Sequence, residues 1–205
     1  MQEINPPSHL SMTPYTWVNR FLPLIKPGGL VLDLATGGGR HLRLLRDRGF
    51  VVCAVDRDTS ALLPFAGPGC EVRQIDLETA EPWPLGDDYD GIIVTNYLHR
   101  PLLRAIGRAL SPGGVLIYET FSRGNERFGG PRNPDFLLCP GELLKAFAML
   151  TIVAFEQSEI SIPRPAVIQR LTAVAGSLGR SPETIVWTPA QQQSNLSVCR
   201  TPPKS

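Results

Sequence analysis

The stretch GGLVLDLATGGGR, residues 28–40, decides the fold that this chain is expected to adopt. Its apolar run Leu30–Leu34 predicts a buried strand, and the glycines at 37–39 predict a tight turn ahead of a leucine-spaced helix over 41–48. Glycines at such a turn let the backbone approach a ligand closely, and the unpaired N–H groups at the start of the helix face the same crevice. We therefore expect a nucleotide-cofactor site at this turn.

The composition of the chain limits its class. A length of 205 residues suits one well-buried domain, and the formal net charge of +1 gives no global electrostatic reason to expect nucleic acid or an anionic membrane as a partner. The four cysteines lack CxxC spacing, so we expect reduced thiols and no metal. No apolar run approaches the roughly 18 residues of a membrane span, and the N-terminus lacks the charged and apolar regions of a signal peptide. These features predict a cytoplasmic protein.

The organisation along the chain predicts one folded domain between two extended ends. The prolines at positions 6 and 7 predict a mobile arm over 1–12, and the loss of hydrophobic periodicity predicts a flexible tail over 177–205. The domain is expected over 13–176. Its first helix, opened by Thr13 and Pro14, either covers the cofactor crevice or only packs on the sheet.

Further apolar runs predict the rest of a sheet. We expect strands over 50–55, 71–75, 90–95, 115–120, 151–155 and 166–175, and helices over 101–110 and 141–150. Crossovers between the first five strands favour parallel pairing. Only about ten mostly polar residues connect the last two strands, and so short a connection favours an antiparallel pair. The expected fold class is α/β, with a doubly wound, mostly parallel seven-stranded sheet whose last strand is antiparallel.

Acidic residues follow two of these strands. Asp56 lies about 20 residues beyond the glycine turn, at the carboxyl end of the neighbouring strand, where a carboxylate can accept hydrogen bonds from two ribose hydroxyls. Asp76 follows the third strand in the equivalent position. Because the carboxyl ends of parallel strands meet at one edge of a sheet, we expect both acids beside the glycine turn.

A long loop over 121–140 leaves the carboxyl end of the fifth strand. Loops of this length inside a compact domain are usually functional or disordered. Because this loop starts where the crevice is expected, we interpret it as a substrate loop or lid.

The order of these features resembles the class I S-adenosylmethionine-dependent methyltransferases over about residues 17–175, a family with a Rossmann-like seven-stranded sheet. Their glycine motif reads acid-x-Gly-x-Gly-x-Gly, and residues 33–39 match it except that Ala35 replaces the first glycine. Residues 90–96 match the fourth-strand motif of the family, and residues 110–117 match its turn and fifth strand.

The resemblance implies S-adenosylmethionine as the cofactor and S-adenosylhomocysteine as the product. Asp33 and the backbone of 35–39 would hold the methionine part, Asp56 the ribose, and Asp76 with Leu77 the adenine. The full set of implied cofactor-binding residues is Asp33, Ala35, Thr36, Gly37, Gly38, Gly39, Asp56, Arg57, Asp76, Leu77 and Asn96.

Residues 125–138 and 140–144 resemble a bacterial branch of tellurite-resistance-type or small-molecule methyltransferases. This resemblance implies a small-molecule acceptor with an oxygen, nitrogen, sulfur or metalloid nucleophile. Arg123, Arg127 and Arg132 in the loop either bind a carboxylate or phosphate of the acceptor or pin the loop to surface acids. The sequence leaves these two interpretations open.

A general base is optional in this chemistry, because the sulfonium already activates the methyl group and the protein mainly aligns the nucleophile. The candidates for a base are His99 first, then Tyr97, Glu119 and His41. His99 could instead cap a helix or shape the pocket, and Glu119 could equally be a buried acid paired with an arginine.

Two alternatives compete with a methyltransferase. A nicotinamide-dependent reductase also places an acid after the second strand, but the chain has no G-x-G-x-x-G pattern at the turn and no Tyr-x-x-x-Lys pair. A non-catalytic module that binds the cofactor for regulation is compatible with the lack of an unmistakable catalytic residue. The oligomeric state is not indicated by the sequence.

Overall fold

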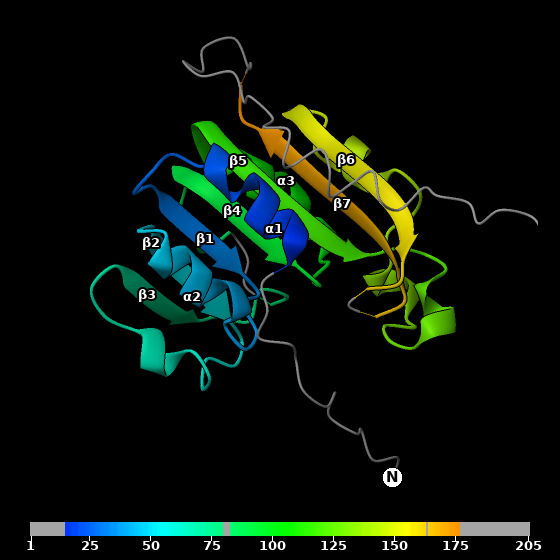
Figure 1. The fold of residues 1–205 in the computed structure, drawn as a ribbon, viewed down its shortest axis with the longest axis horizontal. Helices are drawn as coiled ribbons and strands as arrows, with labels where there is room; N and C mark the ends of the chain where they lie inside the picture. Colours follow the sequence, from blue (N-terminus) through cyan, green and yellow to red (C-terminus); the bar gives the residue numbers. More distant parts are fainter. Residues whose placement is uncertain (1–14, 80–82, 163, 177–205) are drawn as a thin grey trace, which may run out of the picture.

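The computed structural model describes residues 15–79, 83–162 and 164–176. Its strands form one seven-stranded sheet of order β3-β2-β1-β4-β5-β7-β6 (Figure 1). The strands are β1 (Leu30–Leu34), β2 (Val51–Asp56), β3 (Cys70–Gln74), β4 (Tyr89–Thr95), β5 (Leu110–Phe121), β6 (Thr151–Ile160) and β7 (Ala166–Val174). The first five strands pair in parallel, and β7 is antiparallel to both β5 and β6. The predicted fold class is confirmed.

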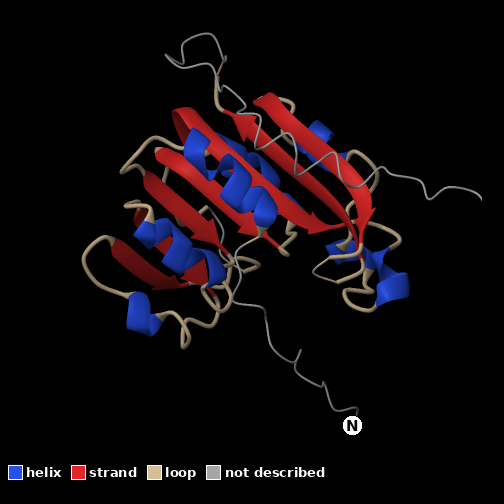
Figure 2. Ribbon diagram, in the orientation of Figure 1, coloured by secondary structure: helices blue, strands red, loops and turns tan. Residues whose placement is uncertain are grey.

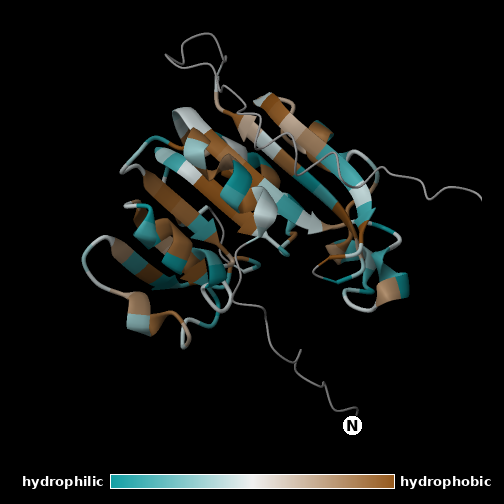
Figure 3. Ribbon diagram, viewed as in Figure 1, coloured by the Kyte–Doolittle hydropathy of each residue, from teal (hydrophilic) through white to brown (hydrophobic). Residues whose placement is uncertain are grey.

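Helices cover both faces of this sheet (Figures 1 and 2). On one face α1 (Thr16–Phe21) and α2 (Arg40–Asp47) pack against alternate side chains of the central strands, and on the other face α3 (Leu103–Arg108) and α4 (Glu142–Ala146) pack against the remaining ones. This alternation follows from the period of two along a strand, and strands covered on both faces read as continuous apolar runs. Figure 3 shows the hydrophobic character of these central strands.

Several elements differ in length from the sequence prediction. The helix predicted over 141–150 contains only the five residues of α4, and the sixth strand extends to Ile160 rather than ending at 155. The loop over 121–140 contains two short 3-10 helices, η4 (Asn125–Phe128) and η5 (Pro134–Phe136). It is therefore a folded segment rather than a structureless connection.

The fifth strand begins earlier than predicted, at Leu110, because its pairing with β4 is shifted between Tyr89 and Gly91. The strand is therefore irregular between Leu110 and Val115. In this part of the strand a Cβ on Gly114 would approach the carbonyl oxygen of Tyr89 to 2.6 Å. Glycine is therefore required at this position. The register beyond the turn then aligns Thr95 of β4 with Glu119 of β5.

The pairing register brings the carboxyl ends of the central strands to one level. Leu34 aligns with Val55 and with Val94, and Asp56 aligns with Gln74. The residues that follow these strands therefore share one edge of the sheet, as predicted.

Two further sequence predictions concern other parts of the chain. The boundaries predicted for the domain, its arm and its tail fall outside the described residues, or at their limits, and stay predictions. Among the described residues, no helix is long and apolar enough to span a membrane.

Candidate cofactor site

The glycine turn is held against β2 by a buried threonine. The hydroxyl of Thr36 donates to the carbonyl of Asp33 at 2.7 Å and accepts from the amide of Val55 at 3.1 Å, while its own amide donates to the carbonyl of Val55 at 3.0 Å. Ala35 and Gly37 on either side have φ angles of 54° and 59°, in the left-handed region. Thr36 therefore shapes the turn, and its hydroxyl is already used within the protein.

Asp56 bridges the turn from the end of β2. Its two carboxylate oxygens accept hydrogen bonds from the amides of Gly37, at 2.7 Å, and Asp58, at 3.1 Å. A carboxylate oxygen can accept two hydrogen bonds, so each oxygen keeps one free lone-pair site. Asp56 is half-buried and lines the cavity described below.

Asp33 lies beneath the turn, only 1% exposed, and its Oδ2 atom has no hydrogen-bond partner among the described residues. Burial raises its pKa to about 7; the nearby Arg40 guanidinium lowers the pKa and the Asp56 carboxylate raises it further. An unpartnered buried carboxyl is costly, and a neighbouring cationic group would relieve that cost. The turn is thus built over an acid that lacks a partner.

An aromatic residue from the start of α1 reaches this region. The hydroxyl of Tyr15 accepts a hydrogen bond of 2.7 Å from the side chain of Asn96, and its backbone amide donates to Nε2 of His41 at 3.3 Å. The guanidinium of Arg40 lies 4.5 Å from the centre of the Tyr15 ring. Arg40 and Asn96 line the cavity, whereas the buried residues of α1 pack against the sheet, so the two alternatives for the first helix stay open.

A cavity of about 670 Å³ lies at the carboxyl edge of β1, β2 and β4. Its volume falls within the range of roughly 300–1,000 Å³ that is usual for small-molecule sites. The predicted cofactor residues that line it are Ala35, Gly37, Gly38, Asp56, Arg57, Asp76, Leu77 and Asn96, whereas Asp33, Thr36 and Gly39 lie beneath or beside the turn. The cavity also contains residues that the sequence reasoning did not select, namely Arg40, Ile75, Glu78, Thr95, Leu98, Phe121, Pro131 and Phe136.

The predicted bases occupy different places. Tyr97 lines the cavity, but burial and the carboxylates of Glu78, Asp76 and Asp56 raise its pKa well above its usual range, so it remains a neutral phenol. His99 precedes η3 (Arg100–Leu102), is half-buried, and does not line the cavity.

The other two candidate bases are committed to contacts within the fold. Glu119 is buried against Arg170 at 3.6 Å, the arrangement of the alternative interpretation, and burial raises its pKa. His41 is buried, and burial together with Arg40 lowers its pKa to about 3, so its ring stays neutral and accepts the hydrogen bond from Tyr15. Tyr97 is the one predicted base that the structure places in the cavity.

The three loop arginines lie outside the cavity. Arg127 forms an ion pair with Glu159 of β6, and Arg123 and Arg132 are exposed. Arg40 was not among the predicted site residues, and its place as the first helical residue after the glycine turn was the available signal. Of the described residues, the two cations that line the cavity, Arg40 and Arg57, thus come from the helix after the glycine turn and from the end of β2 rather than from the loop.

Comparison of the sequence with protein-family models gives a match over most of the folded region. A family model described as "Methyltransferase domain" matches residues 9–136, which include every strand from β1 to β5. No curated protein matches the sequence.

Solved structures agree with this fold at low sequence identity. A TehB-like SAM-dependent methyltransferase from Corynebacterium glutamicum is 19% identical with a TM-score of 0.58, and the match covers 79% of this chain and 88% of that one. A SAM-dependent methyltransferase from Mesorhizobium loti is 20% identical with a TM-score of 0.60, covering 77% and 95% of the two chains. A 1,6-didemethyltoxoflavin-N1-methyltransferase from Burkholderia thailandensis, solved with 1,6-didemethyltoxoflavin and S-adenosylhomocysteine, is 20% identical with a TM-score of 0.58, covering 78% and 76%. At these identities the likeness shows the fold alone.

Proposed function

This chain belongs to the methyltransferase-domain family, and on that premise we propose that it transfers a methyl group from S-adenosylmethionine to a small-molecule acceptor bound in the cavity at the carboxyl edge of the sheet. The predicted enzyme class and cofactor are those of the family. The family match does not support the alternative interpretation as a nicotinamide-dependent reductase. The acceptor and the roles of individual residues are the substance of the proposal.

The observation that carries the proposal is Asp56, which spans the glycine turn and still offers acceptor sites to the cavity. We assign the two ribose hydroxyls to these sites, because a carboxylate at the end of the second strand can accept from both. The adenine ring would lie against Ile75 and Leu77, with its amino group toward Asp76. An apolar surface with an acceptor at its rim suits a flat, weakly polar ring carrying one donor group.

The methionine end of the cofactor carries one ammonium and one carboxylate group. The unpartnered carboxyl of Asp33 beneath the turn suits the ammonium, and the guanidinium of Arg40 suits the carboxylate. Arg40 has no ion pair within 4 Å among the described residues and rests on the Tyr15 ring, so its charge is available. The residues present therefore fit the cofactor that the family uses.

When bound, the cofactor supplies a methyl group activated by its sulfonium. The protein contributes alignment and exclusion of water, effects that together can lower a barrier by several kcal/mol. Of the four predicted bases only Tyr97 lines the cavity, and it stays protonated, whereas His99 lies outside the lining. Catalysis is therefore proposed to rest on proximity, with the proton of the acceptor passing to water.

Replacement of Asp56 tests the proposed site. Asp56→Ala is expected to weaken S-adenosylhomocysteine binding about 10- to 100-fold, or about 1.5–3 kcal/mol, because charge-assisted hydrogen bonds to both ribose hydroxyls are lost. Isothermal titration calorimetry on folded protein measures the effect. The affinity of Asp56→Asn is expected to lie between that of the wild-type protein and that of Asp56→Ala. Asp47→Ala is the matched control, since Asp47 is an exposed acid at the far end of α2. Wild-type affinity in Asp56→Ala would remove Asp56 from the site.

Turnover separates an enzyme from a regulatory binding module. A screen with methyl-labelled S-adenosylmethionine and a panel of small acceptors is expected to give transfer to at least one of them. Tight cofactor binding without transfer to any acceptor would favour the module.

A further inference from the structure

Four of the residues that line the cavity form an apolar and partly aromatic wall. It consists of Leu98, after β4, with Phe121, Pro131 and Phe136 from the end of β5 and the loop that follows. We infer that the methyl acceptor is an uncharged aromatic molecule that packs against this wall. The inference rests on the proposed function and names the substrate class of the same site.

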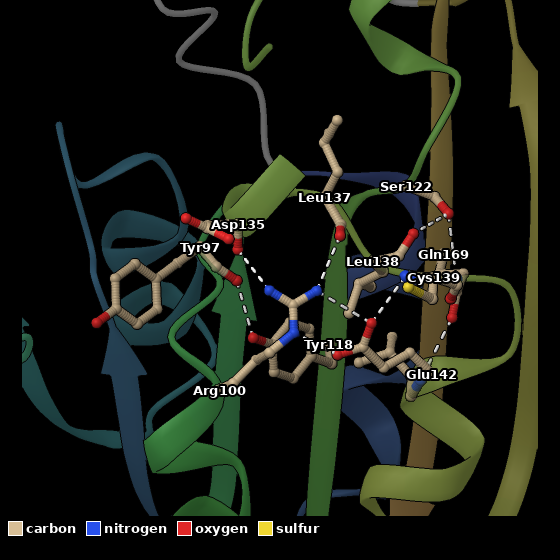
Figure 4. Close-up of polar contacts among 11 residues, drawn as sticks. Tyr97, Arg100, Tyr118, Ser122, Asp135, Leu137, Leu138, Cys139, Glu142 and Gln169 are labelled. Atoms are coloured by element: carbon tan, nitrogen blue, oxygen red, sulfur yellow. Dashed lines mark hydrogen bonds and ion pairs between the residues drawn. The ribbon is translucent and has the colours of Figure 1, made fainter. Parts of the chain in front are cut away.

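Arg100 holds the loop segment that carries Phe136, through contacts with Asp135, Leu137 and Glu142 (Figure 4). Arg100, which follows the cavity segment 95–98, donates from Nη1 to the carbonyl of Asp135 at 2.6 Å and from Nη2 to the carbonyl of Leu137 at 2.9 Å. These carbonyls flank Phe136 on both sides. Nε and Nη2 of the same guanidinium donate to Glu142 at 2.7 and 3.1 Å. The backbone on either side of Phe136 is thus held by two hydrogen bonds from Arg100, and the guanidinium is itself held by two more to Glu142.

A second set of contacts holds the base of the same loop. Gln169 on β7 donates from Nε2 to the carbonyl of Cys139 at 2.6 Å and to the hydroxyl of Ser122 at 3.2 Å. Ser122 in turn donates to the carbonyl of Leu138 at 2.9 Å. Gln169 and Ser122 are buried, so both ends of the loop are anchored to the sheet. A wall held in this way is preformed, which reduces the ordering cost of binding a rigid ring.

The charges around the cavity disfavour an anionic acceptor. The acids Asp56, Asp76 and Glu78 line it, and the described cations that line it are Arg40 and Arg57. Arg40 is assigned to the cofactor carboxylate, and Arg57 follows Asp56 at the ribose end. A carboxylate placed against the apolar wall would therefore be desolvated without a partner, which is costly.

The loop cations either bind acids or lie outside the cavity lining, and Arg123 and Arg132 are exposed residues of the second kind. Arg100 is bound to Glu142 and Arg127 to Glu159, and the guanidinium of Arg164 lies 5.8 Å from the centre of the Phe121 ring without lining the cavity. An aromatic ring, by contrast, packs well against Phe121 and Phe136, because aromatic pairs stabilise beyond the area they bury.

The reaction balances with a neutral acceptor. A lone pair on its oxygen or nitrogen forms the bond to the methyl carbon while the carbon–sulfur bond breaks and its electron pair stays on sulfur. The sulfonium becomes a neutral thioether, and the proton of the acceptor atom leaves to water. No further co-reactant is needed.

Matched acceptors test the inference. Methyl transfer from labelled S-adenosylmethionine is measured for phenol, catechol, 8-hydroxyquinoline and indole, each beside its ring-carboxylated counterpart. The expected result is transfer to one or more neutral members and at least about tenfold lower kcat/KM for the carboxylated partner, the ratio that corresponds to about 1.4 kcal/mol. Equal or faster transfer to the carboxylated members would overturn the inference, as would binding of S-adenosylhomocysteine without methylation of any neutral member.

Substitution of two phenylalanines in the loop distinguishes the role of the wall from that of the rest of the loop. Phe136 is 43% exposed and lines the cavity, whereas Phe128 is 39% exposed and does not. Phe136→Ala is expected to raise KM for the neutral acceptor about tenfold with an unchanged dissociation constant for S-adenosylhomocysteine, and Phe128→Ala is expected to leave both unchanged. An unchanged KM in a folded Phe136→Ala variant would refute the role of the wall. If the wild-type protein does not bind S-adenosylhomocysteine, the proposed function itself is refuted.

Discussion

The carboxyl of Asp33 lies beneath the glycine turn with one oxygen unpartnered, and burial raises its pKa to about 7 from an ordinary value of 3.8. Between these two pH values the folded protein binds more protons than the unfolded chain. The contribution of Asp33 to stability is therefore present below pH 4 and is lost as the pH rises through 7. Without ligand, the ionised form is the costly one, and a bound ammonium group would reverse that preference.

This reversal predicts pH-dependent binding of S-adenosylhomocysteine. If the ammonium of the ligand pairs with ionised Asp33, affinity rises about tenfold between pH 6 and pH 8, because the proton on Asp33 must leave first. Calorimetry in buffers of different ionisation enthalpy should record the release of this proton, and Asp33→Asn should bind more weakly with no such dependence. Equal wild-type affinity at pH 6 and pH 8 would contradict the pairing.

At the scale of elements, the loop after β5 depends on the contact between Arg100 and Glu142. The side chain of Arg100 is 37% exposed and that of Glu142 is 20% exposed, and Glu142 also accepts from the amide of Cys139 at 2.7 Å. Removal of the guanidinium leaves a half-buried carboxylate and two backbone carbonyls short of donors. The ion pair between Arg127 and Glu159 joins two side chains more than half exposed, so solvent screens it.

Arg100→Gln is therefore expected to lower the free energy of unfolding by about 1–3 kcal/mol, the cost of losing hydrogen bonds to charged groups. Chemical denaturation measures the loss, and hydrogen exchange should speed up at the amides of residues 135–139 and 141–143. Arg127→Gln is the control and should cost less than about 1 kcal/mol. Similar effects of the two substitutions would show that the Arg100 contact does not hold the loop.

The same elements show what sequence could and could not predict. The strands and the acids that follow them were predictable because each is a local apolar run that ends in a polar residue, as in Val51–Asp56. The length of α4 and the fold of the loop were not, since both depend on contacts between residues far apart, such as Arg100 with Glu142 and Gln169 with Ser122. Arg40 was missed because helical spacing alone cannot tell a solvated arginine from one turned toward a crevice.

At the scale of the whole molecule, two apolar cores on opposite faces of the sheet fix the level at which the central strands end. The glycine turn and Asp56 come together because β1 and β2 end side by side, and Asn96 joins them from β4 on the other side of β1. The end of β5 and the loop that follows it add Phe121, Pro131 and Phe136 to the cavity lining. The site is thus a consequence of strand register, which is why the order of motifs in the sequence was informative.

A crystal structure of the protein with S-adenosylhomocysteine tests this account most directly. The predicted result is a ligand in the 670 Å³ cavity with both ribose hydroxyls on the carboxylate of Asp56, its methionine end between Asp33 and Arg40, and its sulfur facing the wall that contains Phe136. A ligand bound elsewhere, or bound in this cavity with its ribose away from Asp56, would contradict it.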